Sequence, residues 1–376
     1  MKIACISTSQ VPSRTANSIQ MVKTSHAMTQ LGHEVMLYVP GQFTGGIDIR
    51  AHYGLQGNIP IVWVPENRRF KRYDFSWRAV TAARKWGCDL IYTWTPQAAL
   101  LSRMRNTPTI LEMHDRATGL MGPWIVKRYL QSGGQSLLVC VTRALRHALQ
   151  EQLKLVIPDA RVVIAPNGVD LERYRDLPEA AKARAKLGLA EQPTASYTGH
   201  FYAGRGLDIL YHLAQSFPEV QFLWVGGRNA ELDGVKQELV QRKLRNVILT
   251  GFIENQQLPL YQAASDVLLM PYEKAIAGSS GGNSADICSP MKMFEYMAAG
   301  RVILTSDLPV IREVLDENMA VFCPPDDKIA WQEAFARAIR IGNNNQMGCN
   351  ARERSADFDI LARQRKILAG ISGAAL

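Results

Sequence analysis

Short apolar runs alternate with amphipathic helical stretches along the first half of the chain, and this alternation limits the fold more than any other feature. It is typical of βαβ units, whose strands pair in parallel. In the first unit, a helical stretch over residues 18–31 is followed by Gly32, which suits the residue just past a helix end. The predicted strands of this half are residues 3–7, 34–39, 61–64, 90–92, 109–113 and 137–141.

A second series of the same kind begins after a stretch that is typical of a domain boundary. A strand beginning at Val162 runs into a Pro-Asn-Gly turn, and a polar, Ala-rich segment covers residues 171–189. At 376 residues the chain is also long for a single hydrophobic core. We therefore expect an α/β protein with two Rossmann-like domains, over residues 1–175 and 176–354. The predicted strands of the second domain are residues 194–198, 221–225, 247–250, 267–270, 302–305 and 320–323.

Composition excludes several classes of protein. No apolar run approaches the length of about 20 residues that a membrane helix needs, and the first residues resemble a strand more than a secretory signal. The six cysteines and seven histidines show no metal-ligand spacing. We expect a cytoplasmic protein with reduced cysteines and no metal or other cofactor.

Positive charge is concentrated in the first half. The first 180 residues hold 22 Lys and Arg against 13 Asp and Glu, whereas the rest of the chain holds 21 of each. Such a field favours an anionic partner: a membrane surface, a phosphorylated acceptor or nucleic acid. A cluster of cations and aromatic rings predicts either peripheral contact with the inner face of a membrane or a solvated loop. Its members are Arg68, Arg69, Phe70, Lys71, Arg72, Tyr73, Phe75 and Trp77.

The segment 289–300 is the most informative one for chemistry. It is predicted to be a loop, a helix and a turn before a strand, and Pro290 suits the helix start. The free amides there and Lys292 can bind phosphate or sugar oxygens. Glu295 lies three residues after Lys292 on the same helical face, where a carboxylate can accept both hydroxyls of a ribose. A surface Lys/Glu pair on an amphipathic helix is the alternative.

Two glycine-containing loops follow predicted strands of the second half. In open α/β sheets, ligands bind outside the carboxyl ends of the strands. Gly199 and Gly204 let the backbone approach a ligand, and Arg205 can face a diphosphate. Gly226 and Gly227 leave comparable space after the next strand.

Six motifs in order resemble the family 4 glycosyltransferases of the GT-B fold over nearly the whole chain. They lie at residues 31–35, 112–115, 166–170, 199–206, 265–272 and 289–300. The resemblance implies two Rossmann domains facing each other across a cleft, with the C-terminal helix of residues 355–376 packing back on the first. It also implies retaining transfer from a nucleoside-diphosphate sugar without an essential metal, the first domain binding the acceptor and the second the donor.

Site residues follow from the resemblance position by position. Glu295 matches the ribose-binding glutamate, Arg205 the basic residue that neutralises the donor diphosphate, and His114 a histidine that faces the transferred sugar. We expect catalytic roles for His114, Arg205 and Lys292. Asp115 is expected to orient the His114 imidazole or to cap a helix. The expected donor-binding residues are Gly199, His200, Gly226, Phe252, Ile253, Ser289, Pro290, Met291 and Glu295.

The chain also departs from the family pattern. His200 replaces a more usual arginine with a group that is partly protonated at neutral pH, and Lys292 is expected to compensate. Ile287 stands where the family has the first of two glutamates, so Asp286 or the loop 278–284 is expected to hold the donor sugar. The N-terminal loop lacks a usual double glycine, so amides of Asn17, Ser18 and Ile19 are expected to reach the donor phosphates or the acceptor.

No carboxylate is placed as a nucleophile, which favours front-face attack in which the donor phosphate accepts the acceptor proton. UDP-sugars are favoured over GDP-sugars as donors, and the acceptor is a sugar, phospho-sugar or lipid-linked sugar. The alternatives are a sugar-nucleotide epimerase, a phosphorylase that carries pyridoxal phosphate, and a nonenzymatic basic protein that binds membranes or nucleic acid. The chain has no recognisable nucleic-acid module, so we expect no nucleic-acid partner.

Overall fold

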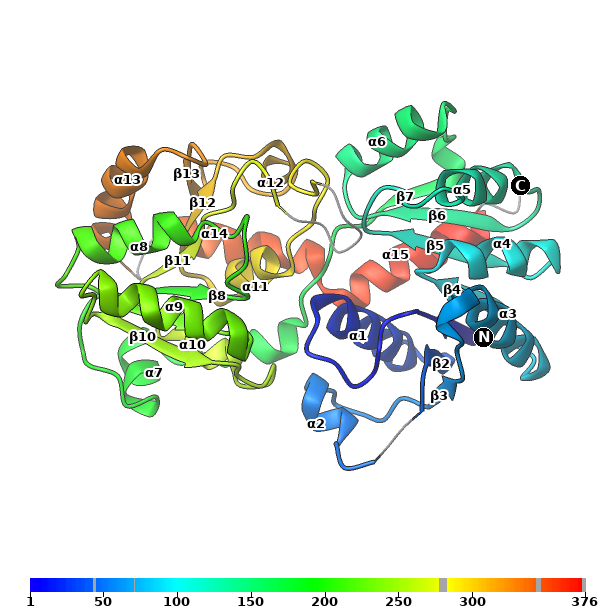
Figure 1. The fold of residues 1–376 in the computed structure, drawn as a ribbon, viewed down its shortest axis with the longest axis horizontal. Helices are drawn as coiled ribbons and strands as arrows, with labels where there is room; N and C mark the ends of the chain where they lie inside the picture. The colour runs from blue at the N-terminus through cyan, green and yellow to red at the C-terminus, as the bar shows by residue number, and fades with distance from the viewer. Residues whose placement is uncertain (43–44, 71, 277–282, 343–345, 374–376) are drawn as a thin grey trace. The chain divides into compact units, whose positions relative to one another are not determined.

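The computed structural model describes residues 1–42, 45–70, 72–276, 283–342 and 346–373. The chain forms two compact units, which Figure 1 colours along the sequence. The first unit comprises Met1–Gly168 and Ile360–Leu376, and the second comprises Val169–Asp359.

The first unit is built on a parallel sheet. Seven strands of the described chain pair in the order β3-β2-β1-β4-β5-β6-β7. This is the Rossmann order with one added strand, and the direction of the strand order reverses between β1 and β4. Every strand expected from the sequence is confirmed, because apolar runs buried on both faces are easy to recognise. The strands are Lys2–Ile6, Glu34–Pro40, Ile61–Val64, Leu90–Thr93, Thr109–Met113, Ser136–Cys140 and Val162–Ile164 (β1–β7).

Helices cover both faces of this sheet. On one face, Met21 and Val22 of α1 pack in a buried cluster with Ile367 and Ile371 of α15. On the other face, Phe75 and neighbouring residues of α3 pack against β1, β2 and β4. The helices of the unit are α1 Ala16–Gln30, α2 Ile49–Tyr53, α3 Tyr73–Lys85, α4 Pro96–Met104, α5 Gly122–Gln131, α6 Arg143–Leu153 and α15 Ile360–Gly373, with 3-10 turns η1 Arg68–Phe70 and η2 Asp159–Arg161.

The second unit repeats the architecture. Six parallel strands of its described residues pair in the order β10-β9-β8-β11-β12-β13, with the reversal between β8 and β11. All six expected strands are confirmed, and with them the α/β class with two Rossmann-like sheets. The strands are Thr194–Thr198, Gln221–Val225, Val247–Gly251, Val267–Met270, Val302–Ser306 and Ala320–Cys323 (β8–β13).

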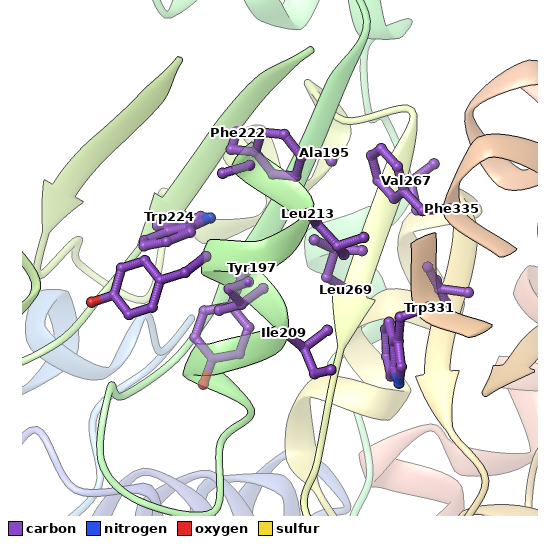
Figure 2. Packing of buried hydrophobic residues seen from close by; sticks show 14 of the residues in the cluster. Ala195, Tyr197, Ile209, Leu213, Phe222, Trp224, Val267, Leu269, Trp331 and Phe335 are labelled. Carbon is purple, nitrogen blue, oxygen red and sulfur yellow. The ribbon is translucent and has the colours of Figure 1, made fainter. Parts of the chain in front are cut away.

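Aromatic side chains fill the core on one face of this sheet. Figure 2 shows Phe222 and Trp224 of β9 in one cluster with Trp331 and Phe335 of α13, and the Phe222 and Phe335 rings stack with centroids 5.6 Å apart. The helices of the unit are α7 Ala180–Lys186, α8 Leu207–Ser216, α9 Asn229–Gln241, α10 Leu258–Ala263, α11 Met291–Ala299, α12 Pro309–Arg312, α13 Lys328–Ile341 and α14 Gln346–Arg354, with 3-10 turns η3 Leu171–Tyr174 and η4 Ser355–Phe358.

The units divide after Gly168 and Asp359, whereas the sequence placed the boundaries after residues 175 and 354. Two contacts within the second unit account for the difference. Val169 donates its amide to the carbonyl of Phe358 at 3.0 Å. The Tyr174 hydroxyl, at the end of η3, donates to Gln262 Oε1 at 2.8 Å.

Three further observations concern the described ranges. No helix there is both long and apolar enough to cross a bilayer. All six cysteines lie in these ranges and are free thiols. No group of three His, Cys, Asp or Glu side chains within them is arranged to hold a metal ion.

Candidate functional site

The second unit gathers its polar loops where its strand order reverses. β8 and β11 are neighbours, but the connections that follow them lead to opposite sides of the sheet, and in open α/β sheets ligands bind beyond the carboxyl ends of the strands at such a point. Residues 199–206 follow β8, and Pro271 and Tyr272 follow β11. The Gly-rich loop that the sequence singled out therefore lies where the strand order reverses.

Glycine is required at three positions in these loops. Gly199 and Gly226 have φ of 141° and 119°, and a Cβ on Gly226 would lie 2.3 Å from the carbonyl oxygen of Gly199. A Cβ on Gly206 would lie 1.8 Å from the carbonyl oxygen of Pro271. Real side chains do not fit at such distances, so the loops after β8, β9 and β11 pack backbone against backbone.

Arg205 and Lys292 both lie over the aromatic ring of Tyr272. The Arg205 guanidinium carbon lies 4.9 Å from the centroid of the Tyr272 ring, and Lys292 Nζ lies 5.5 Å from the same centroid. Lys292 Nζ also lies 3.8 Å from the Tyr197 ring centroid, and Arg205 stacks on Tyr202 at 4.6 Å. Among the described residues, neither cation has a carboxylate within ion-pair distance. The pair therefore retains its capacity to bind an anion.

Burial and mutual repulsion act on these cations. Burial, together with the nearby Arg205, lowers the pKa of Lys292 well below its usual value, and Glu295 offsets part of that effect. Burial also opposes the charge on Arg205, but the phenol groups of Tyr272 and Tyr197 hold its pKa above its ordinary value. Arg205 is therefore always charged, and an anion bound here would favour the charged form of Lys292 as well.

Glu295 lies in a hydrogen-bonded chain on α11. Glu295 is 8% exposed, and its Oε2 accepts a hydrogen bond from Gln262 Nε2 at 3.4 Å. Gln262 in turn accepts from the buried Tyr174 hydroxyl. Gln262 thereby orients one carboxylate oxygen, and the other, which has no hydrogen-bond partner among the described residues, is suited to accept hydroxyl groups.

The N-terminus of α11 is formed by Ser289, Pro290 and Met291. Pro290 is the N-cap residue, and its side chain makes no capping hydrogen bond. Ser289 is buried, and Met291 is half-buried at the first helical position. Lys292 is the second residue of this helix, so its ammonium group extends from the same first turn whose N–H groups carry the positive end of the helix dipole.

His200 does not act as the partly charged group that the sequence suggested. Burial lowers the pKa of its imidazole, although Glu231 offsets part of the shift, so the ring is neutral near pH 7. His200 Nδ1 lies 3.4 Å from Glu231 Oε2, which also accepts the Phe201 amide at 2.9 Å. Glu231 was not singled out from the sequence; its place three residues after the N-cap of α9 is the signal that marks it.

In the first unit, His114 follows β5 and is held by a carboxylate two residues before it. His114 Nε2 lies 2.6 Å from Glu112 Oε1, and Glu112 is completely buried, whereas the His114 side chain is 26% exposed. Asp115, which was expected to orient the imidazole or to cap a helix, accepts the amide of Arg116 at 2.7 Å. The residue that orients the imidazole is therefore Glu112, which the sequence left without a role.

Two family profiles match the chain in sequence order. Glycosyltransferase Family 4 matches residues 19–173, and Glycosyl transferases group 1 matches residues 192–340. The chain belongs to the family 4 glycosyltransferases of the GT-B fold. The resemblance inferred from the six motifs is confirmed.

Curated relatives are themselves glycosyltransferases or glycolipid synthases. An alpha-galactosylglucosyldiacylglycerol synthase of Streptococcus pneumoniae is 26% identical over 52% of this chain and 50% of its own length. The putative teichuronic acid biosynthesis glycosyltransferase TuaH of Bacillus subtilis is 30% identical over 58% of this chain and 53% of its own. The matches thus span about half the length of each relative.

A solved structure resembles the whole chain. Anabaena HepE, in a complex with UDP, superposes with a TM-score of 0.74 at 18% identity, and the match covers 99% of this chain and 100% of that one. At that identity the likeness establishes the GT-B fold.

Other residues expected to serve this glycosyltransferase lie apart from the two cations or face solvent. Phe252 and Ile253 are half-buried just after β10, at the edge of the sheet. Asp286 is exposed, and Ile287 is only 1% exposed, so the position of the missing glutamate is apolar core. Residues 277–282, most of the loop expected to grip the donor sugar, lie outside the described ranges.

The N-terminal loop of the glycosyltransferase already uses two of its three expected amides. The Ser18 amide donates to Thr15 Oγ1 at 3.4 Å, and the Ile19 amide donates to the Thr15 carbonyl at 3.1 Å. The Ser18 hydroxyl is buried against Tyr53. Asn17 is exposed, so its amide and side chain are the ones that remain suited to a ligand.

The basic aromatic segment is partly surface and partly core. Phe70, Tyr73 and Trp77 are exposed, whereas Phe75 is completely buried and belongs to the core, contrary to its place in the expected surface cluster. Lys71 lies outside the described residues. A second exposed apolar group, which the sequence did not suggest, begins α5: Leu120, Met121 and Trp124.

Proposed function

We propose that this glycosyltransferase moves a sugar from a nucleoside-diphosphate sugar to a sugar, phospho-sugar or lipid-linked acceptor, with retention of anomeric configuration. The observation that carries the proposal is the pair of cations over Tyr272, at the point where the strand order of the second unit reverses. Two adjacent positive groups without a carboxylate partner in the described chain suit a diphosphate. A Cβ on Gly199 would lie 2.9 Å from Lys292 Nζ, so glycine at this position keeps the approach to that amine open.

Glu295 is assigned to the nucleoside half of the donor. Its orientation by Gln262 leaves a carboxylate oxygen to accept the ribose hydroxyls. Ser289, Pro290 and Met291 lie on the phosphate side, where the N–H groups of Met291 and Lys292 in the first turn of α11 are the donors, since Pro290 has none. Phe252, Ile253 and the neutral His200 supply van der Waals and hydrogen-bonding contacts.

The reaction follows from where charge develops. As the glycosidic bond to the diphosphate breaks, negative charge grows on the leaving phosphate, and Arg205 and Lys292 stabilise it. The donor phosphate accepts the proton of the attacking acceptor hydroxyl on the same face of the sugar. His114 binds a hydroxyl of the substrate, so the protein acts by positioning and electrostatics and needs no carboxylate nucleophile.

UDP-sugars are the favoured donors, with GDP-sugars as the alternative. The support is the HepE structure, whose complex contains UDP. Acceptor chemistry is supported by the names of the relatives, a glycolipid synthase and a teichuronic acid transferase. A sugar-nucleotide epimerase is the competing activity; it would convert the donor without any acceptor.

Nucleotide binding tests the donor assignment. Excess UDP should raise the melting temperature of the wild type, since a ligand at a concentration one hundred times its Kd adds about 2.7 kcal/mol to the free energy of unfolding. Glu295→Ala and Arg205→Ala should abolish that rise. Glu238→Ala and Arg242→Ala remove an exposed Glu/Arg pair on α9 and should preserve it. No response to UDP, GDP or ADP at millimolar concentration would refute the donor site.

We also propose peripheral contact with an anionic membrane through Arg68, Arg69, Lys71 and Arg72. The supporting observation is that exposed rings accompany these cations: Phe70, Tyr73 and Trp77 around α3, with Trp124 on α5. Both helices follow strands of one parallel sheet, so both begin at its carboxyl edge, where His114 also lies.

Vesicle sedimentation tests this contact. Arg69→Glu with Arg72→Glu should weaken binding to phosphatidylglycerol vesicles at least tenfold, since each cation near an anionic surface contributes about 1 kcal/mol. Met104 is the last residue of α4 and is 72% exposed. Met104→Ala is the control and should leave vesicle binding unchanged. Equal binding of wild type and the double variant would exclude this surface.

A further inference from the structure

The buried carboxylate of Glu112, in the first unit, accepts hydrogen bonds from three side chains. Glu112 Oε1 accepts from His114 Nε2 at 2.6 Å and from Arg363 Nη2 at 2.9 Å. Glu112 Oε2 accepts from the Tyr92 hydroxyl and from Arg363 Nη1 at 3.3 Å. The side chains of Glu112 and Arg363 are 0% and 3% exposed. A carboxylate with four donors is fixed in position.

The ionisation of Glu112 determines which nitrogen of His114 carries a proton. Burial opposes ionisation, but the Arg363 guanidinium and the His114 ring hold the pKa of Glu112 well below its usual range. An ionised carboxylate can only accept, so the neutral imidazole has its proton on Nε2. Nδ1 then carries a lone pair, and it has no hydrogen-bond partner in the described part of the chain.

The guanidinium that holds Glu112 comes from the C-terminal helix. Arg363 lies on α15, and its Nε donates to the Pro166 carbonyl at 2.6 Å while Nη2 donates to the Ala165 carbonyl at 3.0 Å. Pro166 precedes the chain's passage into the second unit at Gly168, and Arg363 follows its return at Ile360. The Arg363 side chain thus links Glu112 to both segments of the chain that run between the two units.

We infer that Glu112 and Arg363 are positioning residues that hold His114 in the Nε2–H tautomer, so that Nδ1 accepts a hydrogen bond from a substrate hydroxyl. This inference rests on the proposed function for its substrate, a sugar hydroxyl, but the tautomer itself does not. Glu112 acts through His114, and Arg363 acts through Glu112. The C-terminal helix is therefore part of the machinery that orients the substrate.

Nitrogen-15 NMR of the ring nitrogens tests the tautomer without substrate. At a pH where His114 is neutral, wild type should show a protonated Nε2 and an unprotonated Nδ1; a His114→Gln variant identifies the signals. A Glu112→Gln variant, whose amide can also donate to the ring, should shift the population toward Nδ1–H. Protonation on Nδ1 in the wild type would overturn the inference, whether or not the variant folds.

Kinetics test the consequence for catalysis. Glu112→Gln and Arg363→Lys should lower kcat/KM roughly 10- to 100-fold, the usual effect of removing an orienting partner. In a His114→Ala background, Glu112→Gln should cause no further loss, since the residue it orients is gone. Additive losses would refute action through His114.

A matched control variant separates the loss of His114 orientation from a general loss of stability. Arg103 is also buried in the first unit and binds backbone carbonyls, at Thr107 and Gly133, without contacting a site residue. Arg103→Lys should lower the melting temperature yet preserve both the tautomer and kcat/KM. An inactive wild type with the Nε2–H tautomer would contradict the proposed transfer, whereas an active wild type with the other tautomer would contradict this inference alone.

Discussion

Replacing Arg205 by methionine should lower kcat/KM for the nucleotide sugar by roughly 10²- to 10³-fold, the usual effect of removing one group that stabilises charge in a transition state. Arg205 is half-buried against Tyr202 and Tyr272, so water cannot simply take its place beside a leaving diphosphate. Methionine keeps much of the apolar contact with the rings and removes only the charge. Initial rates with a UDP-sugar, measured over a range of donor concentrations, provide the comparison.

Variants of Lys292 and of Arg242, an arginine stacked on a ring outside the site, complete this experiment. Lys292→Met should cause a loss of similar size, and the double variant should lose less than the product of the two, because both cations act on one diphosphate. Arg242 stacks on Tyr211 at 4.8 Å but is exposed just after the end of α9. Arg242→Met should retain wild-type kinetics. Unchanged kcat/KM in Arg205→Met would show that the cations over Tyr272 do not serve the donor.

The central strands of both sheets were predictable from the sequence because they are buried on both faces. Every residue of β5 and of β8 is buried, so each strand is an uninterrupted run of mostly apolar or small residues. The helix starts were less exact. The first helix begins at Ala16, two residues before the expected start, because Thr15 supplies the capping oxygen.

Local patterns indicated the loop and the helix start that carry Arg205 and Lys292, whereas contacts between residues distant in sequence were not predicted. Arg205 and Lys292 were each recognised beside a loop or helix start, and the structure brings them over the same ring. Glu112 received no role because its partner, Arg363, is 251 residues away in sequence. A single buried glutamate in a strand gives no local indication of the arginine that neutralises it.

Glu112 should also make stability depend on pH. Its pKa in the folded protein lies below the ordinary value of 4.5, so the ionised form stabilises the fold fully above pH 4.5, and this contribution is lost as pH falls. At neutral pH, Glu112→Gln should lower the free energy of unfolding by about 3–5 kcal/mol, because Arg363 remains buried without a counter-charge. The difference from wild type should narrow by about 1.4 kcal/mol for each pH unit below 4.5.

Urea unfolding of both proteins between neutral pH and about pH 3.5 measures this convergence, and hydrogen exchange of the β5 amides assigns the transition to the first unit. Glu34→Gln is the matched control, since Glu34 pairs with Lys2 at 3.9 Å on the surface of the same sheet. Exposed pairs contribute little, so this variant should stay within about 1 kcal/mol of wild type at every pH. A constant difference would show that folding does not lower the pKa of Glu112, and a difference that widened as pH fell toward 4.5 would show that Glu112 is protonated in the fold. The Nε2–H tautomer of His114 would then lose its physical cause, because a protonated carboxyl group could itself donate to the ring.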